Sequence, residues 1–392
     1  MQNSLAYQNA IDLLHRVSSS RGFLAAAQQE DNYSRVWTRD AVVCGLAALQ
    51  TKDVKLVETF KHSLETIWQH QHPVGFLPSN VDINANSASY GGTAGRADTA
   101  SWAIIGLCMF TLYTGNSDLA NSCNKKVSKA FQLMEAWEFN GKHLIYVPQS
   151  ADWADEYMQH GYILFDQLLR LWALQLAGIV FALNLYADKA EHLKQLIQHN
   201  YFYRNNNENW YAVNILHQKE AAPKNYWWMG FNPAQIYAQF DLQANALALL
   251  LKIGNAEQTT LVLEHMNVLL KNNNEMIPSF SPVITEKDWQ MHELKDNYAY
   301  RFRNKPHEFH NGGLWPVWNG WMVAALQMHN KELLQTQLMK NLLNTISKDN
   351  FDMNECYHGQ TGIACGVKGC GWSAAGVIIA ENGDQLFKSP FQ

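Results

Sequence analysis

Acidic residues recur beside tryptophan, histidine and asparagine along this chain of 392 residues. The first such stretch runs from Tyr90 to Asp98, where a glycine-rich turn leads into Arg96 and then into an apolar helix. An acid in the first turn of a helix suits the helix dipole and can cap free backbone amides. Taken alone, Asp98 is therefore predicted to be a helix cap.

Five further stretches hold acids, amides, histidine or tryptophan: residues 33–40, 150–156, 225–232, 307–316 and 351–358. Two carboxyl groups are enough for sugar hydrolysis, because one protonates the leaving oxygen and the other activates water or attacks carbon. The candidate acids are Asp40, Asp98, Asp152, Asp155, Glu156, Glu308, Asp352 and Glu355.

Several of these acids have a structural explanation. Asp155 and Glu156 open a helix predicted over residues 156–176, so at least one of them is expected to cap it. Asp40 follows Arg39 at another helix start, where a cap and an acceptor for a sugar hydroxyl fit equally well. Glu355 precedes no immediate helix and lies in a loop with aromatic neighbours, so a catalytic role explains it better than a cap does.

The run His310-Asn-Gly-Gly-Leu-Trp-Pro-Val-Trp combines polar side chains with two tryptophans. Its glycines allow a close approach of the backbone, and Pro316 fits an early helical position. His310 and Asn311 can bind hydroxyl groups at a rim. A helix-start turn packed by tryptophan explains the same run without a ligand.

Composition excludes some classes of protein. The chain is 47% hydrophobic, which is ample for one large domain or two ordinary ones. Its net charge is −5 and no basic run of the nucleic-acid-binding kind occurs. The 14 tryptophans and 16 tyrosines often stand near polar residues, a setting that suits sugars, although ordinary core packing explains many of them.

No export signal is visible at the N-terminus, and the longest apolar run, near residues 171–183, is too short to span a membrane. We therefore expect a cytoplasmic protein without a membrane partner, and the sequence leaves a homo-oligomer open.

The six cysteines are scattered and are expected to be reduced thiols. Cys356, Cys365 and Cys370 with His358 are the residues best suited to a metal site, but a paired Cys-x-x-Cys is missing, so no metal or cofactor is expected.

Helical periodicity recurs almost throughout the chain. Segments that are apolar on most sides begin near residues 39, 98, 156, 234, 314 and 371, and amphipathic segments alternate with them. An all-round apolar helix must be buried, whereas an amphipathic one lies at the surface. Short connections make neighbours antiparallel, so all inner helices would begin at one end. This pattern predicts an all-α fold, an (α/α)6 barrel of alternating inner and outer helices.

No Pro/Ser/Gly-rich linker divides the chain, so a single catalytic domain over residues 1–392 is favoured over two helical domains. Only residues 201–216 suggest a small β-hairpin. The polar stretches named above all precede inner helices, whereas the segments before the outer helices are ordinary polar turns. We call these stretches (residues 33–40, 90–98, 150–156, 225–232, 307–316 and 351–358) the mouth, and we expect them to form one concave site.

Several segments resemble, in order, the neutral/alkaline invertase family of glycoside hydrolases, which has a six-hairpin (α/α)6 barrel. His310-Asn-Gly-Gly-Leu-Trp-Pro is similar to that family's His-Asn-Gly-Gly-Ser-Trp-Pro, and Gly95-Arg-Ala-Asp-Thr-Ala-Ser-Trp to its Val-Asp-Ser-Gly-x-Trp-Trp segment. Further similar segments begin at Arg35, Asp152, Asn354 and Gly371.

The resemblance implies an inverting hydrolase of a small α-linked saccharide, sucrose first, with Asp98 as general acid and Glu355 as general base. Residues expected to bind the saccharide are Arg39, Asp40, Tyr90, Arg96, Trp153, Asp155, His310, Asn311, Trp315 and Tyr357. The chain departs from the family beside both acids, where Ala103 replaces a tryptophan and His358 replaces an aspartate, and this leaves the identity of the sugar open.

Three other functions remain open from the sequence. An exo-acting α-glucosidase or debranching-type enzyme would use the same barrel and acids. A sugar epimerase or isomerase would use pairs of histidines drawn from His307, His310 and His358. A non-catalytic saccharide-binding protein would not need both acids.

Overall fold

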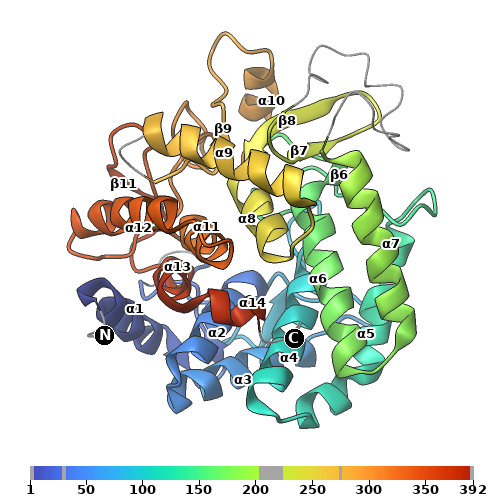
Figure 1. The fold of residues 1–392 in the computed structure, drawn as a ribbon. Helices are drawn as coiled ribbons and strands as arrows, with labels where there is room; N and C mark the ends of the chain where they lie inside the picture. The colour runs from blue at the N-terminus through green and yellow to red at the C-terminus, as the bar shows by residue number, and fades with distance from the viewer. Residues whose placement is uncertain (1–3, 29–31, 203–223, 273–275, 389–392) are drawn as a thin grey trace.

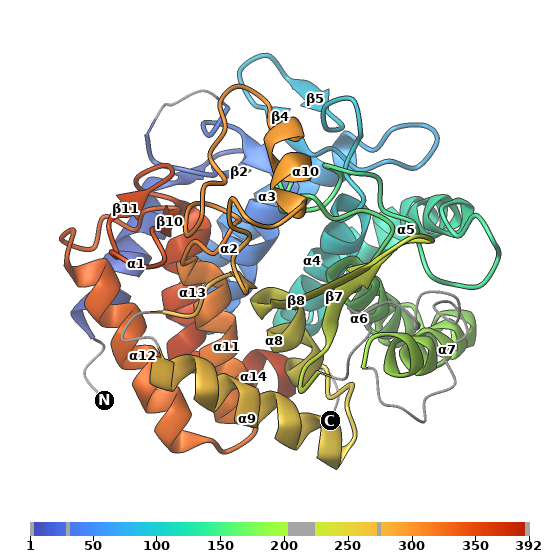
Figure 2. The same ribbon diagram turned by 90° about the horizontal axis from the view of Figure 1, so that it is seen from above.

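The computed structural model describes residues 4–28, 32–202, 224–272 and 276–388, and helices dominate it (Figure 1). Six of them have little or no exposed face, namely α2 (Thr38–Thr51), α4 (Thr99–Thr114), α6 (Leu164–Val180), α8 (Leu242–Leu250), α11 (Pro316–Met328) and α13 (Gly371–Asn382). Each contacts the next in this order, and α13 also contacts α2. All of them begin at the end that faces the viewer in Figure 2.

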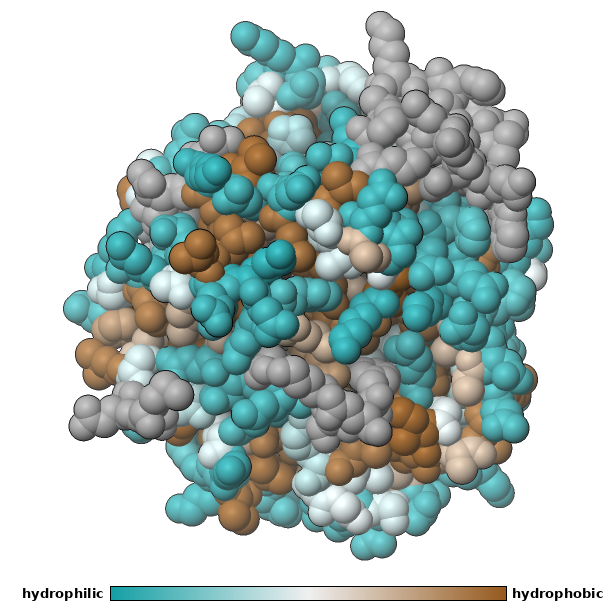
Figure 3. Space-filling view, in the orientation of Figure 1, coloured by the Kyte–Doolittle hydropathy of each residue, from teal (hydrophilic) through white to brown (hydrophobic). Residues whose placement is uncertain are grey.

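Six amphipathic helices alternate with these along the chain: α1 (Leu5–Arg16), α3 (Val54–Gln69), α5 (Asp118–Ala136), α7 (Asn184–Asn200), α9 (Ala256–Asn272) and α12 (Glu332–Ser347). They bury one stripe each, as α3 does with Leu56, Phe60 and Leu64. α1 packs on α13, α3 on α2, α5 on α4, α7 on α6 and α12 on α11. The face in Figure 3 is accordingly mostly hydrophilic, with hydrophobic side chains in smaller groups.

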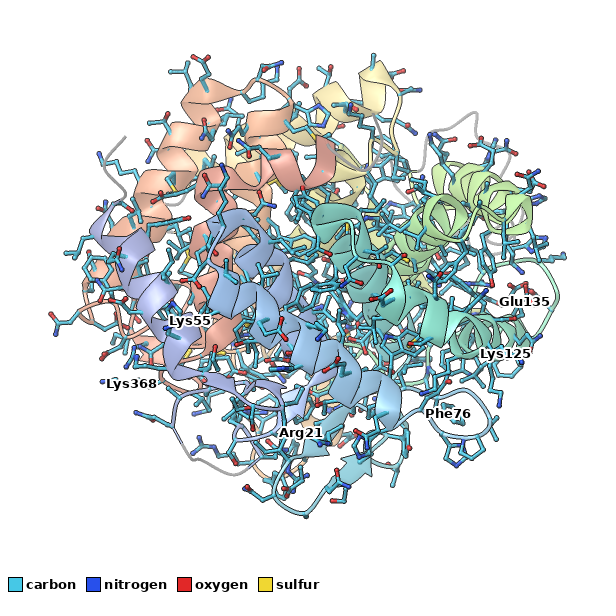
Figure 4. All side chains as sticks on the ribbon, turned by 90° about the horizontal axis from the view of Figure 1, so that it is seen from below. Arg21, Lys55, Phe76, Lys125, Glu135 and Lys368 are labelled. Carbon is cyan, nitrogen blue, oxygen red and sulfur yellow. The ribbon has the colours of Figure 1, made fainter. Side chains whose placement is uncertain are left out.

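Figure 4 shows the end opposite to the mouth, where the labelled Lys125 and Glu135 of α5 lie at the outer edge of the molecule. Two short helices complete the helical part, α10 (Gln290–Asp296) and α14 (Asp384–Lys388). No helix among the described residues combines the length and apolarity needed to cross a bilayer.

The predicted alternation of buried and amphipathic helices is confirmed, but two predicted starts of inner helices are wrong. Helices α6 and α8 begin at Leu164 and Leu242, about two turns later than the predicted 156 and 234. The intervening residues form a loop and strands instead. Asp155 and Glu156 therefore open no helix.

The strands are short and antiparallel, and most precede inner helices. One sheet orders β3 (Val36–Trp37), β4 (Asn80–Asp82) and β5 (Ser87–Ser89), and the other orders β6 (Tyr162–Ile163), β7 (Trp228–Phe231), β8 (Ile236–Asp241) and β9 (Phe280–Ser281). Two hairpins pair β1 (Ser18–Ser19) with β2 (Gly22–Phe23) and β10 (Cys356–Tyr357) with β11 (Ala364–Cys365). Runs of two to six residues are too short for a period-2 signal. The hairpin predicted over 201–216 lies almost wholly outside the described residues.

Two glycines bring α11 and α13 into close contact. A Cβ atom added to Gly320 would lie 2.0 Å from the carbonyl oxygen of Gly376, and one added to Gly376 would lie 2.6 Å from the Cα of Val317. The obstructing atoms are backbone, so they cannot rotate away. Both helices begin beside the candidate site, and their separation is therefore set by the absence of side chains at this crossing.

We expect Gly320→Ala to lower the free energy of unfolding by about 1–3 kcal/mol or more, because the added methyl group overpacks a backbone contact. Denaturant unfolding of the purified variant measures this change. Gly178→Ala in α6 is the matched control, since its Cβ would meet Ala187 at an ordinary 3.4 Å. That variant should be neutral or stabilised by about 0.5–1 kcal/mol. Equal unfolding energies for the two variants would contradict the packing argument.

Candidate active site

Asp98 lies at the N-cap position of α4, yet its side chain makes no capping hydrogen bond. The residue is 1% exposed, and neither carboxylate oxygen has a hydrogen-bond partner. Burial raises the pKa of Asp98 above its ordinary value, against the opposing charges of Arg39 and Arg96. The prediction that this side chain caps the helix is wrong, and the structure leaves a buried acid with free oxygens.

Arg39 and Asp40 occupy the first turn of α2. The guanidinium of Arg39 lies 3.5 Å from Oδ2 of Asp40 and 3.6 Å from Oδ2 of Asp98. It also packs over the ring of Trp372 in α13, with 5.0 Å between Cζ and the ring centroid. Burial raises the pKa of Asp40, although Arg39 opposes this shift. One cation thus joins the starts of α2, α4 and α13.

Glu355 lies immediately before β10 and is 6% exposed. The hydroxyl of Tyr33 donates to its Oε1 at 2.9 Å, and the backbone amide of Val367 donates to its Oε2 at 3.3 Å. Burial raises the pKa of Glu355 to about 7, even though these hydrogen bonds and the charge of Arg303 favour the ionised form. Asp40 is close enough to raise this pKa further, so Glu355 lies near the first turn of α2.

Tyr33 and Arg303 were not singled out as site residues from the sequence. Arg303 forms a bidentate ion pair with Glu156, in which Nε donates to Oε2 at 3.1 Å and Nη2 donates to Oε1 at 2.8 Å. Its Cζ also lies 3.9 Å from the centroid of the Phe309 ring. Tyr33 belongs to a stretch that the sequence assigned to the mouth, but Arg303 has no motif around it. Their partners are 322 and 147 residues away in sequence, so no local pattern reveals them.

The loop over residues 150–156 carries two acids in different surroundings. Asp152 accepts hydrogen bonds from the amide of Ala154 at 2.9 Å and from Gln159 at 2.8 Å, and burial raises its pKa to about 7. Asp155 is more exposed and pairs with Nη2 of Arg96 at 2.6 Å. Arg96 also donates to the carbonyl of Ser150, so the loop is fastened to the residues before α4.

A cluster of buried aromatic rings lies beside Arg39. Trp153 contacts the rings of His310, Trp315, Trp318 and Trp372, with centroids between 5.1 and 6.3 Å apart. His310 stacks on Trp315 at 5.5 Å. Burial, followed by the nearby charges of Arg303, Arg39 and Arg96, lowers the pKa of His310 well below its ordinary value. This histidine is therefore neutral, and its Nδ1 has no hydrogen-bond partner.

Three predicted saccharide ligands use their polar atoms within the protein. Asn311 is fully buried, and its amide exchanges two hydrogen bonds with the backbone of Ile284. The hydroxyl of Tyr357 donates to Asp349 at 2.9 Å, and that of Tyr90 donates to the carbonyl of His70 at 2.9 Å. In the structure, all three polar groups form hydrogen bonds within the protein that hold loops in place.

The remaining predicted acids and histidines lie nearer the surface. Asp352 pairs with Lys368, which is labelled at the edge of Figure 4, with 2.5 Å between Oδ2 and Nζ. His307 and His358 stack on each other with centroids 6.0 Å apart. No group of three or more His, Cys, Asp or Glu side chains among the described residues is arranged to hold a metal ion.

Asp166 and Asp241 are buried acids near Asp152 that no sequence motif marks. Asp166 lies in the first turn of α6 and Asp241 caps α8, where its Oδ1 accepts from the amide of Ala244 at 2.8 Å. Burial raises the pKa of both well above the ordinary value, and the charge of Asp152 raises each further. Both oxygens of Asp166 lack hydrogen-bond partners. Each acid stands within an apolar run of the sequence, and such a run predicts a core helix rather than a site residue.

We expect Asp166→Asn to stabilise the protein at alkaline pH. The pKa of Asp166 is raised on folding, so its ionisation opposes folding, and stability is lost as pH rises from the unfolded-state value toward the folded-state value. Removing the ionisable group should raise the free energy of unfolding by about 1–3 kcal/mol at pH 8 and by less at pH 5. Denaturant unfolding at both pH values measures the change, with Asp118→Asn on the exposed side of α5 as control. A difference from wild type that is equal at the two pH values would refute this assignment.

Comparison with known proteins points to glycoside hydrolases. The model of the alkaline and neutral invertase family matches residues 222–390, which include Glu355 and the His310–Pro316 run but not Asp98. Over 414 residues the chain is 22% identical to probable alkaline/neutral invertase D of Arabidopsis thaliana, a similarity that covers 91% of this chain and 76% of that protein.

Solved structures with a similar fold extend over nearly the whole chain. GH63 mannosylglycerate hydrolase from Thermus thermophilus, in complex with glucose, has a TM-score of 0.67 at 13% identity and covers 95% of this chain and 99% of that one. A bacterial glucoamylase complexed with acarbose has a TM-score of 0.66 at 14% identity, covering 98% of this chain and 56% of that one. The glucoamylase of Saccharomycopsis fibuligera gives 0.62 at 12% identity, covering 97% and 94%.

At such identities the structural likeness shows the fold, while the family model confirms the resemblance recognised in the sequence. Residues 222–390 match the alkaline and neutral invertase family of glycoside hydrolases, and the fold of the chain is that of glucoamylase-type enzymes.

Proposed function

We propose that this protein is an inverting glycoside hydrolase that cleaves a small, neutral, α-linked saccharide, with sucrose as the first substrate to test. The observation that carries the proposal is the contrast between two buried carboxyl groups. The carboxyl oxygens of Asp98 have no hydrogen-bond partner and are available to a substrate, whereas Glu355 is held by two donors that favour its ionised form. Pairs of acids in unlike surroundings are typical of general acid and general base.

In the proposed reaction, Asp98 protonates the glycosidic oxygen as the bond to the anomeric carbon breaks. Burial raises the pKa of Asp98, which favours the protonated form that a general acid needs. Arg39 lies beside Asp98 and stabilises the carboxylate that remains after transfer. Inversion then requires that water attack from the opposite face of the sugar.

Glu355 is the proposed base for that water. Tyr33 and Val367 occupy one lone-pair direction on each carboxylate oxygen, which fixes the orientation of the group and leaves further acceptor capacity for water. The positive charge of Arg303 favours the ionised form needed to accept a proton. Asp40 and Asp155 are proposed to accept hydroxyl groups of the sugar, and Trp153, His310 and Trp315 to pack against its faces.

Charge pairing favours a neutral substrate. Among the described residues of the mouth, Arg35 pairs with Asp82, Arg39 with Asp40 and Asp98, and Arg96 with Asp155. Arg303, which lies outside the mouth, pairs with Glu156 inside it. Each guanidinium thus already has a carboxylate, and Asp152 and Glu355 add further acids. A phosphate or carboxylate on the substrate would meet no unmatched cation among these residues, so we propose an uncharged saccharide.

We also infer that the six inner helices close the (α/α)6 barrel expected from the sequence and that residues 1–392 form one catalytic domain. The contacts from α2 through α13 and back to α2 support the barrel. A cytoplasmic location remains a prediction from the sequence.

Replacing either acid should abolish hydrolysis without unfolding the protein. We expect Asp98→Asn and Glu355→Gln each to lower kcat by about 100-fold or more, because general acid and base catalysis typically contribute 10²–10⁴-fold. Circular dichroism and thermal melting report whether the variants are folded. Near-normal turnover in either folded variant would reject that residue's assigned role.

The pH dependence of activity should follow the surroundings of Glu355. A base with a pKa of about 7 is protonated as pH falls, so kcat/KM should decline on the acid side of pH 7. Tyr33→Phe removes a hydrogen bond that lowers this pKa, and the acid limb should therefore move to higher pH. A pH–rate profile measures the shift, and an unmoved acid limb in this variant would argue against Glu355 as the titrating base.

Product analysis on a panel of disaccharides distinguishes the substrates. Release of glucose and fructose from sucrose supports the proposal, whereas glucose released only from α-glucosides indicates an exo-acting α-glucosidase. NMR of the fresh product gives its anomeric configuration. Solvent deuterium entering the sugar without bond cleavage would indicate an epimerase, and binding without turnover would indicate a saccharide-binding protein.

A further inference from the structure

Two free thiols face each other across the hairpin that follows the proposed base. Cys356 on β10 and Cys365 on β11 are register partners, and their Sγ atoms are 3.1 Å apart. Neither is in a disulfide. A disulfide bond brings two sulfur atoms to about 2 Å, so an approach of about 1 Å converts this pair into a covalent link.

The thiol pair is adjacent in sequence and in space to Glu355. Cys356 directly follows Glu355, and Cys365 directly precedes Gly366. A Cβ added to Gly366 would lie 2.5 Å from Oε2 of Glu355, so the carboxylate already fills the space beside that backbone. The next residue, Val367, donates the hydrogen bond to the same oxygen. Both sides of the hairpin therefore fix the carboxylate.

The two thiols differ in accessibility. Cys356 is fully buried, whereas Cys365 is partly exposed. Burial, together with the neighbouring Cys365 and Glu355, raises the pKa of the Cys356 thiol well above its usual range. An oxidant from solvent thus reaches Cys365 first. Cys356 is then close enough to attack the oxidised sulfur of Cys365 and form a disulfide.

We propose that Cys356 and Cys365 are a redox modification site, at which a peroxide forms a reversible disulfide that displaces Glu355 and lowers turnover. The site itself follows from the geometry of the hairpin, while the effect on turnover rests on the function proposed above.

The chemistry balances with hydrogen peroxide as the oxidant. The sulfur of Cys365 attacks one peroxide oxygen, the O–O bond breaks, and a sulfenic acid and one water are produced. The sulfur of Cys356 then attacks the sulfenic sulfur, so the S–S bond forms, the S–O bond breaks and a second water leaves. Two thiols lose two hydrogen atoms in total and the peroxide is reduced to two waters. An external thiol reverses the change by exchange.

The approach of the two sulfurs has a direct effect on the carboxylate. We expect part of the approach of about 1 Å to draw β10 and β11 together beside Glu355, whose side chain lies against the backbone of Gly366. A displacement of this size at a reacting group can reduce rate by about 100-fold. We therefore expect oxidation to lower kcat by about tenfold to 100-fold, with little change in KM.

The test uses the full-length protein, reduced and then treated with hydrogen peroxide. Intact mass and peptide mapping without reductant should give a loss of two hydrogen atoms and a linked pair of peptides containing Cys356 and Cys365. Turnover of the saccharide identified by the product panel should fall and return after dithiothreitol. Absence of this linked pair in the oxidised protein overturns the site, whether or not the protein hydrolyses a sugar.

Two variants separate this pair from general oxidation. Cys365→Ser should keep kcat within about twofold of wild type and lose its sensitivity to peroxide, since one thiol cannot close the bond. Cys123→Ser, at a buried thiol of α5, should respond to peroxide as wild type does. Peroxide sensitivity that persists in Cys365→Ser, or a linked pair formed with unchanged turnover, overturns the proposed effect on Glu355. Inactivity of the reduced wild-type protein on every saccharide refutes the proposed function and leaves the mapping as the test of the site.

Discussion

The burial of Arg39 between two carboxyl groups is the interaction on which the mouth depends. Asp98 and Asp40 are both almost fully buried, and an isolated buried carboxylate costs several kcal/mol. Arg39 supplies the opposite charge at 3.5–3.6 Å. Burial nevertheless raises the pKa of Asp98, and Arg39 only opposes that shift. Its contact with Trp372 ties the same charge to the last inner helix. Moving any of α2, α4 or α13 would disturb this balance.

Short strands and loops hold several residues of the proposed site, beside those at the starts of α2 and α4. Glu355 precedes β10, Asp152 and Asp155 lie in the loop before β6, and Arg303 lies beyond α10. The helices fix where these segments start and end. The glycine contact between α11 and α13 fixes the distance between those two helices. Such a division is common, because a rigid scaffold positions loops that can vary in chemistry.

The sequence predicted the helices well because burial leaves a periodic signal. Alternation between all-round apolar and amphipathic segments predicted the first residues of α2, α4, α11 and α13 to within two residues. It failed at α6 and α8, where short apolar strands run into apolar helices and periodicity cannot separate the two. The mouth was predicted from polar residues before the inner helices. Asp166 and Asp241 were missed because single acids inside apolar runs resemble core helix, and Arg303 because its pairing with Glu156 depends on tertiary contact alone.

The contact between Tyr33 and Glu355 joins residues near opposite ends of the chain. During synthesis on the ribosome, Tyr33 would emerge 322 residues before its partner. Helix α13, which packs on both α1 and α2, emerges later still. The residues of the proposed site are therefore not all present in a nascent chain until synthesis has passed α13. Contacts of such long sequence separation also slow folding, because the loop between the partners must close before the contact can form.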